Sequence, residues 1–307
     1  MIVQALRNVR EISKDRAYVW REWFAILPDL AKIRISLLAT LTAATGYLLA
    51  KGKITIHMLV PTVAVFLLAC GSSALNQYQE REIDKLMDRT KSRFIPSGRL
   101  NPETALRISL SLILSGALIL LLGVGKPALA LGLFAVLWYN LIYTTLKQKT
   151  AFAAVPGALV GAIPPVLGWV AGAGNILDPR IWDVALFFFV WQIPHFWLLA
   201  LDFSKDYEKA GLPSITQSFS TQQTKRIVFI WLLSTGVAGL SFSCSGLIHS
   251  HSVSLFLFAA TSWFIWSAID FFRLNPQGTG LRMTFTKLNI YALLVLFLLS
   301  VDRFLSP

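Results

Sequence analysis

Long apolar stretches recur along the chain and are separated by short polar segments. A helix needs about 20 residues to cross a hydrocarbon layer of roughly 30 Å. Backbone amides find no water in lipid, so each crossing segment must close its own hydrogen bonds, which favours helices over short alternating strands. The pattern predicts an all-α integral membrane protein with transmembrane helices at approximately residues 34–50, 57–75, 104–124, 127–146, 151–172, 181–201, 227–247, 252–272 and 284–302.

A polar segment with charges of both signs, NQYQEREIDKLMDRTKSR at residues 76–93, follows the second predicted helix. Its oxygen-bearing side chains recur every four residues, which on a continuous helix would place them in one ribbon. Carboxylates on one face repel each other unless a cation lies among them, and Mg²⁺ suits such oxygen ligands while keeping positions for phosphate. The alternative is a solvated loop with internally paired charges. The spacing predicts four metal ligands: Asn76, Glu80, Asp84 and Asp88.

A second acidic segment, DFSKDYEKAG at residues 202–211, follows the sixth predicted helix. The second and sixth helices are four spans apart, so both segments lie on the same side of the membrane at equivalent helix ends. This arrangement predicts a weak internal duplication. We expect Asp202 and Asp206 to face the first segment across a central cavity as further metal ligands, although a plain surface loop is the alternative.

Composition and charge support a membrane protein of defined orientation. The chain is 55% hydrophobic and only 14% charged. If the amino terminus lies on the side of the acidic segments, 23 of the 28 lysines and arginines lie on that side. The positive-inside bias then predicts a cytoplasmic amino terminus and an external carboxyl terminus. The net charge of +12 needs no nucleic acid, because anionic lipid headgroups and anionic substrates account for it.

Three regions are expected: a cytoplasmic or interfacial segment at 1–33, a nine-helix domain at 34–302 and an external tail at 303–307. The first 33 residues lack the apolar core of a removable signal peptide. A helix lying in the membrane interface is predicted there, because apolar side chains share one face: Trp20, Trp23, Phe24, Leu27 and Leu30. Cys70 and Cys244 lie in apolar spans, so we expect packing roles and no disulfide framework.

Further motifs follow the first acidic segment in order: YTTLK at 143–147, GALVGAIPPVLGW at 157–169, WQIPHF at 191–196 and DYEKAGLP at 206–213. With NxxxE and IDxxM in residues 76–87, they resemble the signature of the UbiA-type intramembrane prenyltransferases. Among these, the pattern is most similar to the branch that farnesylates protoheme IX to heme O. The chain departs from the usual pattern in having Lys-Ile-Arg at 32–34 in place of Lys-Pro-Arg, and Glu80 where Asp is commoner.

The resemblance implies a fold, substrates and residue roles. It implies nine helices around a central cavity, Mg²⁺, farnesyl diphosphate as donor, protoheme IX as acceptor, residence in the cell inner membrane and association with a heme A synthase. His195 is expected to bind heme through its iron or a propionate. The catalytic group is expected to comprise Asn76, Glu80, Asp84, Tyr143 and Lys147, and the diphosphate clamp Arg34, Arg89, Arg93 and Lys147.

Three other functions remain open at the level of sequence. A sister prenyltransferase with an aromatic acceptor would share the metal and diphosphate chemistry, so the acidic segments alone cannot separate it from a heme enzyme. An ion-coupled transporter could use paired acids at helix ends to bind its coupling ion. A purely structural membrane protein gives no reason for the duplicated acids.

Overall fold

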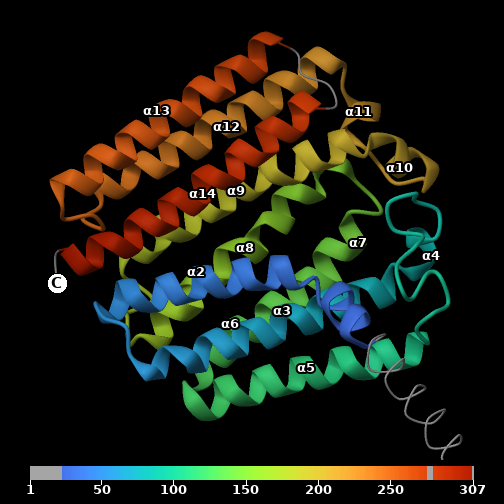
Figure 1. Ribbon diagram of the computed structural model, residues 1–307, viewed down its shortest axis with the longest axis horizontal. Coiled ribbons are helices and arrows are strands. Elements are labelled where there is room, and N and C mark those ends of the chain that lie inside the picture. Colours follow the sequence, from blue (N-terminus) through green and yellow to red (C-terminus); the bar gives the residue numbers. More distant parts are fainter. Residues whose placement is uncertain (1–22, 275–278, 306–307) are drawn as a thin grey trace, which may run out of the picture.

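The computed structural model describes residues 23–274 and 279–305, and within them nine helices are long and apolar enough to cross a membrane (Figure 1). All nine predicted spans are confirmed. They are α2 (Ile33–Lys51), α3 (Leu59–Gln79), α5 (Pro102–Gly123), α6 (Lys126–Leu137) with η2 (Trp138–Tyr143) and α7 (Thr144–Leu146), α8 (Ala154–Ala171), α9 (Pro179–Asp202), α12 (Thr221–Cys244), α13 (His251–Leu274) and α14 (Thr279–Leu305).

Short helical turns join the spans. They are η1 (Ile56–Met58), α4 (Arg81–Asp84), η3 (Ala151–Ala153), α10 (Ser204–Lys209) and α11 (Ile215–Ser218). Residues 23–30 are also helical, and Leu30 is buried whereas Phe24 is exposed. Trp20, which the interfacial-helix prediction includes, lies outside the described residues.

Local sequence signals start several of the spans. Asn101 and Asp178 precede α5 and α9, and their side-chain oxygens accept the backbone N–H two residues further on. Each is followed by a proline at the first helical position, where the missing N–H costs nothing because the helix would not use it. Ser220 starts α12 with a reciprocal capping box.

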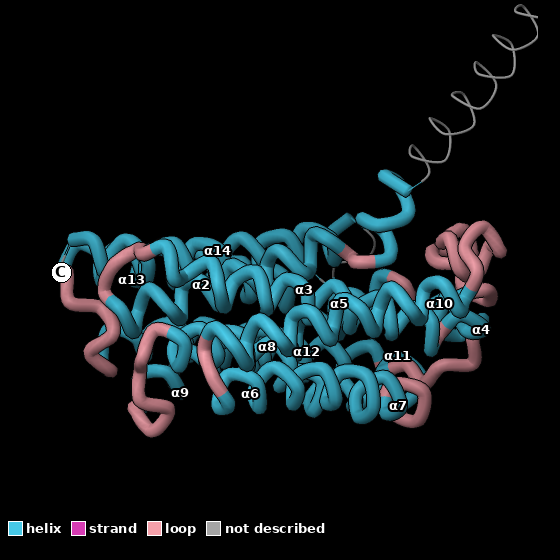
Figure 2. Tube along the Cα trace, turned by 90° about the horizontal axis from the view of Figure 1, so that it is seen from below, coloured by secondary structure: helices cyan, strands magenta, loops and turns pink. Residues whose placement is uncertain are grey.

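Consecutive spans pack against each other throughout the bundle, and α14 returns to contact both α2 and α9 (Figures 1 and 2). Helix α2 also packs closely on α8. A Cβ atom placed on Gly168 would lie 1.8 Å from the Ala43 carbonyl oxygen. This crossing therefore requires a residue without a side chain, as is common where membrane helices approach closely.

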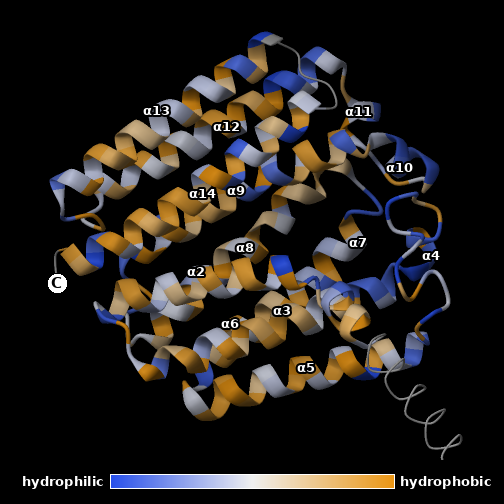
Figure 3. Ribbon diagram, in the orientation of Figure 1, coloured by the Kyte–Doolittle hydropathy of each residue, from blue (hydrophilic) through white to orange (hydrophobic). Residues whose placement is uncertain are grey.

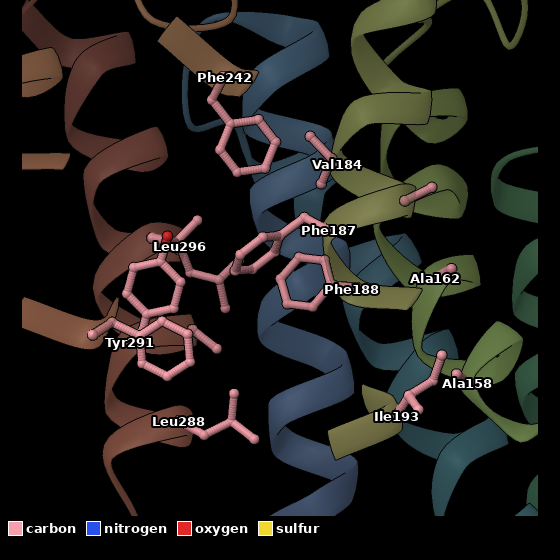
Figure 4. Close-up of a cluster of buried hydrophobic side chains, with 14 of the residues drawn as sticks. Ala158, Ala162, Val184, Phe187, Phe188, Ile193, Phe242, Leu288, Tyr291 and Leu296 are labelled. Carbon is pink, nitrogen blue, oxygen red and sulfur yellow. The ribbon is translucent and has the colours of Figure 1, made fainter. Parts of the chain in front are cut away.

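The largest apolar core lies among the later spans (Figure 4). Phe187 of α9, Phe242 of α12 and Tyr291 of α14 are fully buried and pack their rings together. The Tyr291 hydroxyl is satisfied by Thr261 of α13 at 2.9 Å. This core joins four spans into one unit and holds α9 in place.

Polar elements gather at one end of the bundle, opposite the carboxyl terminus (Figures 1 and 3). Helices α4, α7, α10 and α11 all lie there. The predicted duplication is visible in the chain path, because α3 and α9 each end, break at one residue and continue into a short helix. Each short helix carries a buried aspartate, Asp84 in α4 and Asp206 in α10.

Candidate active site

Two buried carboxylates form the centre of the polar end. Glu80 ends α3 and Asp84 ends α4, and they are 3% and 1% exposed. Nζ of Lys147 lies 2.6 Å from a Glu80 carboxylate oxygen, and Nη1 of Arg93 lies 2.8 Å from Oδ2 of Asp84. A buried charge without a partner is strongly destabilising, so each base is needed where it stands. The backbone carbonyl of Asp84 additionally accepts the Thr90 hydroxyl at 2.8 Å.

Asn76, one turn before Glu80, connects this centre to two other elements. Its Oδ1 accepts from Lys32 Nζ at 3.0 Å, and its Nδ2 donates to the Thr144 hydroxyl at 3.1 Å. Lys32 has a left-handed backbone with φ 44° immediately before α2. Such a conformation is uncommon for a residue with a side chain. It turns the ammonium group of Lys32 toward the site from outside the first span.

The site therefore combines three bases with two buried carboxylates. The pKa of Lys32 is lowered to about 7, chiefly by burial and next by the neighbouring Arg93, and Glu80 partly offsets both effects. An excess of bases in a protected location favours an anionic ligand. Lysine and arginine are the groups that recognise phosphate oxygens, as point charge and planar fork respectively.

An irregular turn in the fourth span aims Lys147 at Glu80. Residues Trp138–Tyr143 form a π-helical turn, and the Thr144 hydroxyl donates to the Tyr139 carbonyl at 2.9 Å. The Tyr143 ring stacks between Tyr139 and Phe196, with centroid distances of 5.6 and 5.4 Å. Tyr143 thus belongs to an aromatic wall that runs from the bases toward α9.

The second acidic segment contacts the first through hydrogen bonds from backbone N–H groups to a carboxylate. Both carboxylate oxygens of Asp206 accept backbone N–H groups, from Asp88 at 3.3 Å and from Arg89 at 3.2 Å. Asp88 itself is exposed and pairs with Lys209 of α10 and with Lys91. These two lysines, Lys209 first, lower the pKa of Asp88 to about 2. The two segments therefore lie together, as the duplication predicts, but they touch directly through Asp206 instead of facing each other across a cavity.

The expected ribbon of four side chains on one continuous helix is wrong. Helix α3 ends at Gln79, and after α4 the chain turns, so Asp88 is exposed and pairs with Lys209 whereas Glu80 and Asp84 are buried. In the described part of the chain, no three acidic, histidine or cysteine side chains are close enough to hold a metal ion. Lys147 pairs with Glu80, Arg93 with Asp84 and Lys209 with Asp88.

Three other predicted site residues lie at the edge of the site. Asp202 pairs with Arg282 of α14, with Oδ2 3.0 Å from Nε. Arg34 is exposed on α2. The Arg89 guanidinium lies over the Phe203 ring, 4.6 Å from its centroid.

His195 lies deeper in α9, beside Phe196 of the aromatic wall. Its ring is flanked by Trp191 and Phe285, with centroid distances of 4.9 and 4.6 Å. Its Nδ1 lies 3.0 Å from Oδ1 of Asn289 in α14. Among the polar partners at the site, Lys32, Thr144 and Asn289 were missed as functional candidates. Only Lys32 had a sequence signal, as the first base of the Lys-Ile-Arg triplet before α2.

Fold and site together define a multi-pass α-helical membrane protein with a protected, base-rich site at one membrane face. Residues 38–296 match the UbiA prenyltransferase family, and the chain belongs to that family. A relative from Geobacter sulfurreducens called protoheme IX farnesyltransferase is 38% identical over 219 residues, covering 71% of this chain and 81% of the relative. A relative of the same name from Myxococcus xanthus is 34% identical over 289 residues, covering 90% and 94%.

Solved structures share the fold. A digeranylgeranylglyceryl phosphate synthase superposes with a TM-score of 0.75 at 17% identity, covering 92% of this chain and 99% of that chain. A UbiA homolog from Archaeoglobus fulgidus bound to GPP and Mg²⁺ superposes with a TM-score of 0.64 at 13% identity, covering 90% and 99%. The predicted nine-helix prenyltransferase architecture is thereby confirmed.

Proposed function

We propose that this protein transfers a farnesyl group from farnesyl diphosphate to a vinyl group of protoheme IX, giving heme O and diphosphate. The buried centre with more bases than carboxylates carries the proposal, because it suits an anionic leaving group. The choice of acceptor draws on the relatives from Geobacter sulfurreducens and Myxococcus xanthus, whose names state farnesyl transfer to protoheme IX and which match 71% and 90% of the chain.

The bases act on the leaving group. Diphosphate oxygens accept hydrogen bonds from Lys32, Arg93 and Lys147, which stabilises the negative charge that develops as the C1–O bond breaks. The electron pair of the C1–O bond leaves with the diphosphate. The π electrons of the vinyl group form the new bond to C1, and water adds to the cation left beside the porphyrin ring and loses a proton. The aromatic wall of Tyr143 and Phe196 excludes bulk water from the allylic carbon.

The donor set around Asn76 fits Mg²⁺, which prefers oxygen ligands and often binds through one or two carboxylates plus substrate phosphates. Asn76, Glu80 and Asp84 would hold it. When bound, the ion supplies positive charge to the departing diphosphate. Asp88, Asp202 and Asp206 are engaged by lysines, Arg282 and backbone N–H groups respectively, so we assign them to holding the loops.

We further propose that the site faces the cytoplasm from the cell inner membrane, with the carboxyl terminus external. The distribution of lysine and arginine supports this orientation. Association with a heme A synthase stays a prediction.

The test uses purified protein in lipid vesicles with Mg²⁺, farnesyl diphosphate and protoheme IX. We expect a more hydrophobic heme on reversed-phase chromatography and release of pyrophosphate. Asp84→Asn should lower pyrophosphate release at least a hundredfold, because Arg93 would lose its buried partner. The matched Asp202→Asn should keep most activity, because Asp202 pairs at the edge of the site with Arg282, whose largely exposed guanidinium is screened by water.

Two outcomes would replace the proposal. Product with a phenolic acid and none with heme would move the protein to the prenyltransferases with aromatic acceptors. Ion-coupled transport without any pyrophosphate release would make it a transporter.

A further inference from the structure

The hydrogen bonds around His195 identify which ring nitrogen carries the proton. Nδ2 of Asn289 donates to the Phe285 carbonyl oxygen at 2.9 Å. A carbonyl oxygen only accepts, so the amide nitrogen of Asn289 faces Phe285 and its amide oxygen faces the imidazole. That amide oxygen also only accepts, and it lies 3.0 Å from Nδ1 of His195. Nδ1 must therefore be the protonated nitrogen.

The consequence is a free lone pair at the other nitrogen. A neutral imidazole with its proton on Nδ1 has an unprotonated Nε2. No described residue hydrogen-bonds to Nε2, whose ring is flanked by Trp191 and Phe285. A lone pair cannot donate a hydrogen bond to a carboxylate, but it can coordinate a metal. Metal-binding histidines almost always donate their other N–H to an oxygen acceptor, which is the arrangement found here.

The position of His195 connects it to the bases at the polar end. The adjacent Phe196 stacks on Tyr143, one turn before Lys147. His195 lies seven residues before Asp202 at the end of α9, which is roughly 10 Å along the helix axis. The stacked rings of Phe196 and Tyr143 thus connect His195 to the helix that carries Lys147.

We propose that His195 coordinates the iron of protoheme through Nε2, and that Asn289 is the positioning residue that holds the proton on Nδ1. The inference rests on the proposed function, since it concerns how the acceptor is bound. The sequence left open whether His195 contacts the heme iron or a heme propionate, and the inference favours the iron. The iron accepts the Nε2 lone pair without any change of its oxidation state.

Two probes that differ only in the metal test this assignment. Ferric protoheme IX and iron-free protoporphyrin IX are titrated separately into the full-length protein in detergent. For His195→Gly we expect protoheme affinity to fall at least tenfold, protoporphyrin affinity to stay within twofold, and added imidazole to restore the wild-type heme spectrum. An equal loss for both probes, or no loss for protoheme, would overturn the assignment. His57→Gly and His251→Gly, at exposed positions, are controls that should bind both probes normally.

The positioning role of Asn289 is tested with variants that remove or keep the side-chain oxygen that accepts the Nδ1–H of His195. Asn289→Leu should weaken protoheme binding about 10- to 100-fold, the usual loss for a residue that orients a metal ligand, and should spare protoporphyrin. Asn289→Asp keeps an acceptor for Nδ1–H, so it should retain affinity while lowering the heme midpoint potential. If Asn289→Leu changes neither heme affinity nor potential, Asn289 has no positioning role.

The two levels of the proposal fail in different ways. Heme O formation with a heme spectrum independent of His195 would remove the iron contact and leave the proposed function standing. A wild-type protein that binds neither probe and prenylates only a phenolic acceptor would overturn both.

Discussion

The charge of Lys32 is open to change near neutral pH. Its pKa is lowered from 10.5 to about 7, chiefly by burial. Between these values the unfolded chain binds a proton that the folded protein lacks, so the free energy of unfolding should rise with pH in that window. Below pH 7 both states are protonated and the cost of burying the charge is fully present. Burial favours the neutral amine of Lys32, whereas a bound diphosphate would stabilise its ammonium form.

We therefore predict that Lys32 makes diphosphate binding pH-dependent. Above pH 7 the empty site must take up a proton at Lys32 to bind the anion, so affinity for a non-reactive farnesyl diphosphate analogue should fall by up to about tenfold per pH unit. Calorimetric titrations between pH 7 and 9 would measure this. Arginine stays protonated throughout, so Lys32→Arg is the matched control. Equal slopes for both proteins would contradict the prediction.

Asp206 is predicted to hold the loop after α4 closed. Asp206→Asn replaces one acceptor oxygen with a donor, so the N–H of Asp88 or Arg89 loses its partner. Hydrogen bonds to charged groups contribute about 1.5–3 kcal/mol. We expect faster tryptic cleavage at the nearby Arg89 and slower pyrophosphate release.

The neighbouring Glu208→Gln provides the control for Asp206→Asn, because Glu208 is exposed on the same short helix. It should be cleaved at the wild-type rate. Unchanged cleavage in Asp206→Asn would show that the loop does not depend on this carboxylate.

Residue types could be predicted from the sequence more fully than their partners. The acidic segments pointed to Glu80 and Asp84, and both are buried at the centre. The expectation for Asp88 assumed one continuous helix, and the break at Glu80 directs Asp88 to Lys209 instead. Asn289 had no signal, because its role depends on α14 packing beside α9, and long-range packing of this kind is not encoded in local spacing.

Among the elements, the π-helical turn of the fourth span determines where Lys147 points. A π turn accommodates one more residue than the α-helical turn it replaces, which rotates everything that follows. Thr144 and Lys147 come directly after it and contact Asn76 and Glu80. The π turn therefore positions Thr144 and Lys147 for their contacts with Asn76 and Glu80.

Deleting Leu141 should move Lys147 away from Glu80. The side chain of Leu141 is 57% exposed, so its loss leaves the core intact, but closing the extra residue would rotate Lys147 about 100° around the helix axis. We predict retained helix content by circular dichroism and loss of pyrophosphate release. Leu141→Ala keeps the chain length and should remain active. Full activity of the deletion variant would show that the turn does not position Lys147.

The spanning helices could be predicted because each one is long and apolar. The first residues of several helices could also be predicted from capping sequences such as Asn101-Pro102 and Asp178-Pro179. The π turn was not predictable, since its sequence WYNLIY contains no proline or glycine that would mark a break in the helix. Its geometry is held by tertiary partners, including Gln79, which donates to the Asn140 carbonyl at 3.2 Å.

For the whole molecule, the polar end and the carboxyl terminus lie at opposite ends of the bundle (Figure 1). A diphosphate made in the cytoplasm would reach the bases directly only if the polar end faces inward. The excess of lysine and arginine at that end favours this orientation, because basic loops are retained on the cytoplasmic side. Orientation is therefore a property of the loops and can be tested independently of catalysis.

We predict that single cysteines at the two ends report opposite sides of the membrane. Cys70→Ala and Cys244→Ser provide a background without thiols, since these are the two cysteines of the chain. Ser97→Cys lies exposed in the loop after α4, and Ser252→Cys lies exposed at the start of α13 at the other end. In intact cells a membrane-impermeant maleimide should label position 252 and not position 97. Permeabilised cells should show both, which controls for access. Labelling of position 97 in intact cells would place the base-rich site outside, where no cytoplasmic diphosphate could reach it directly.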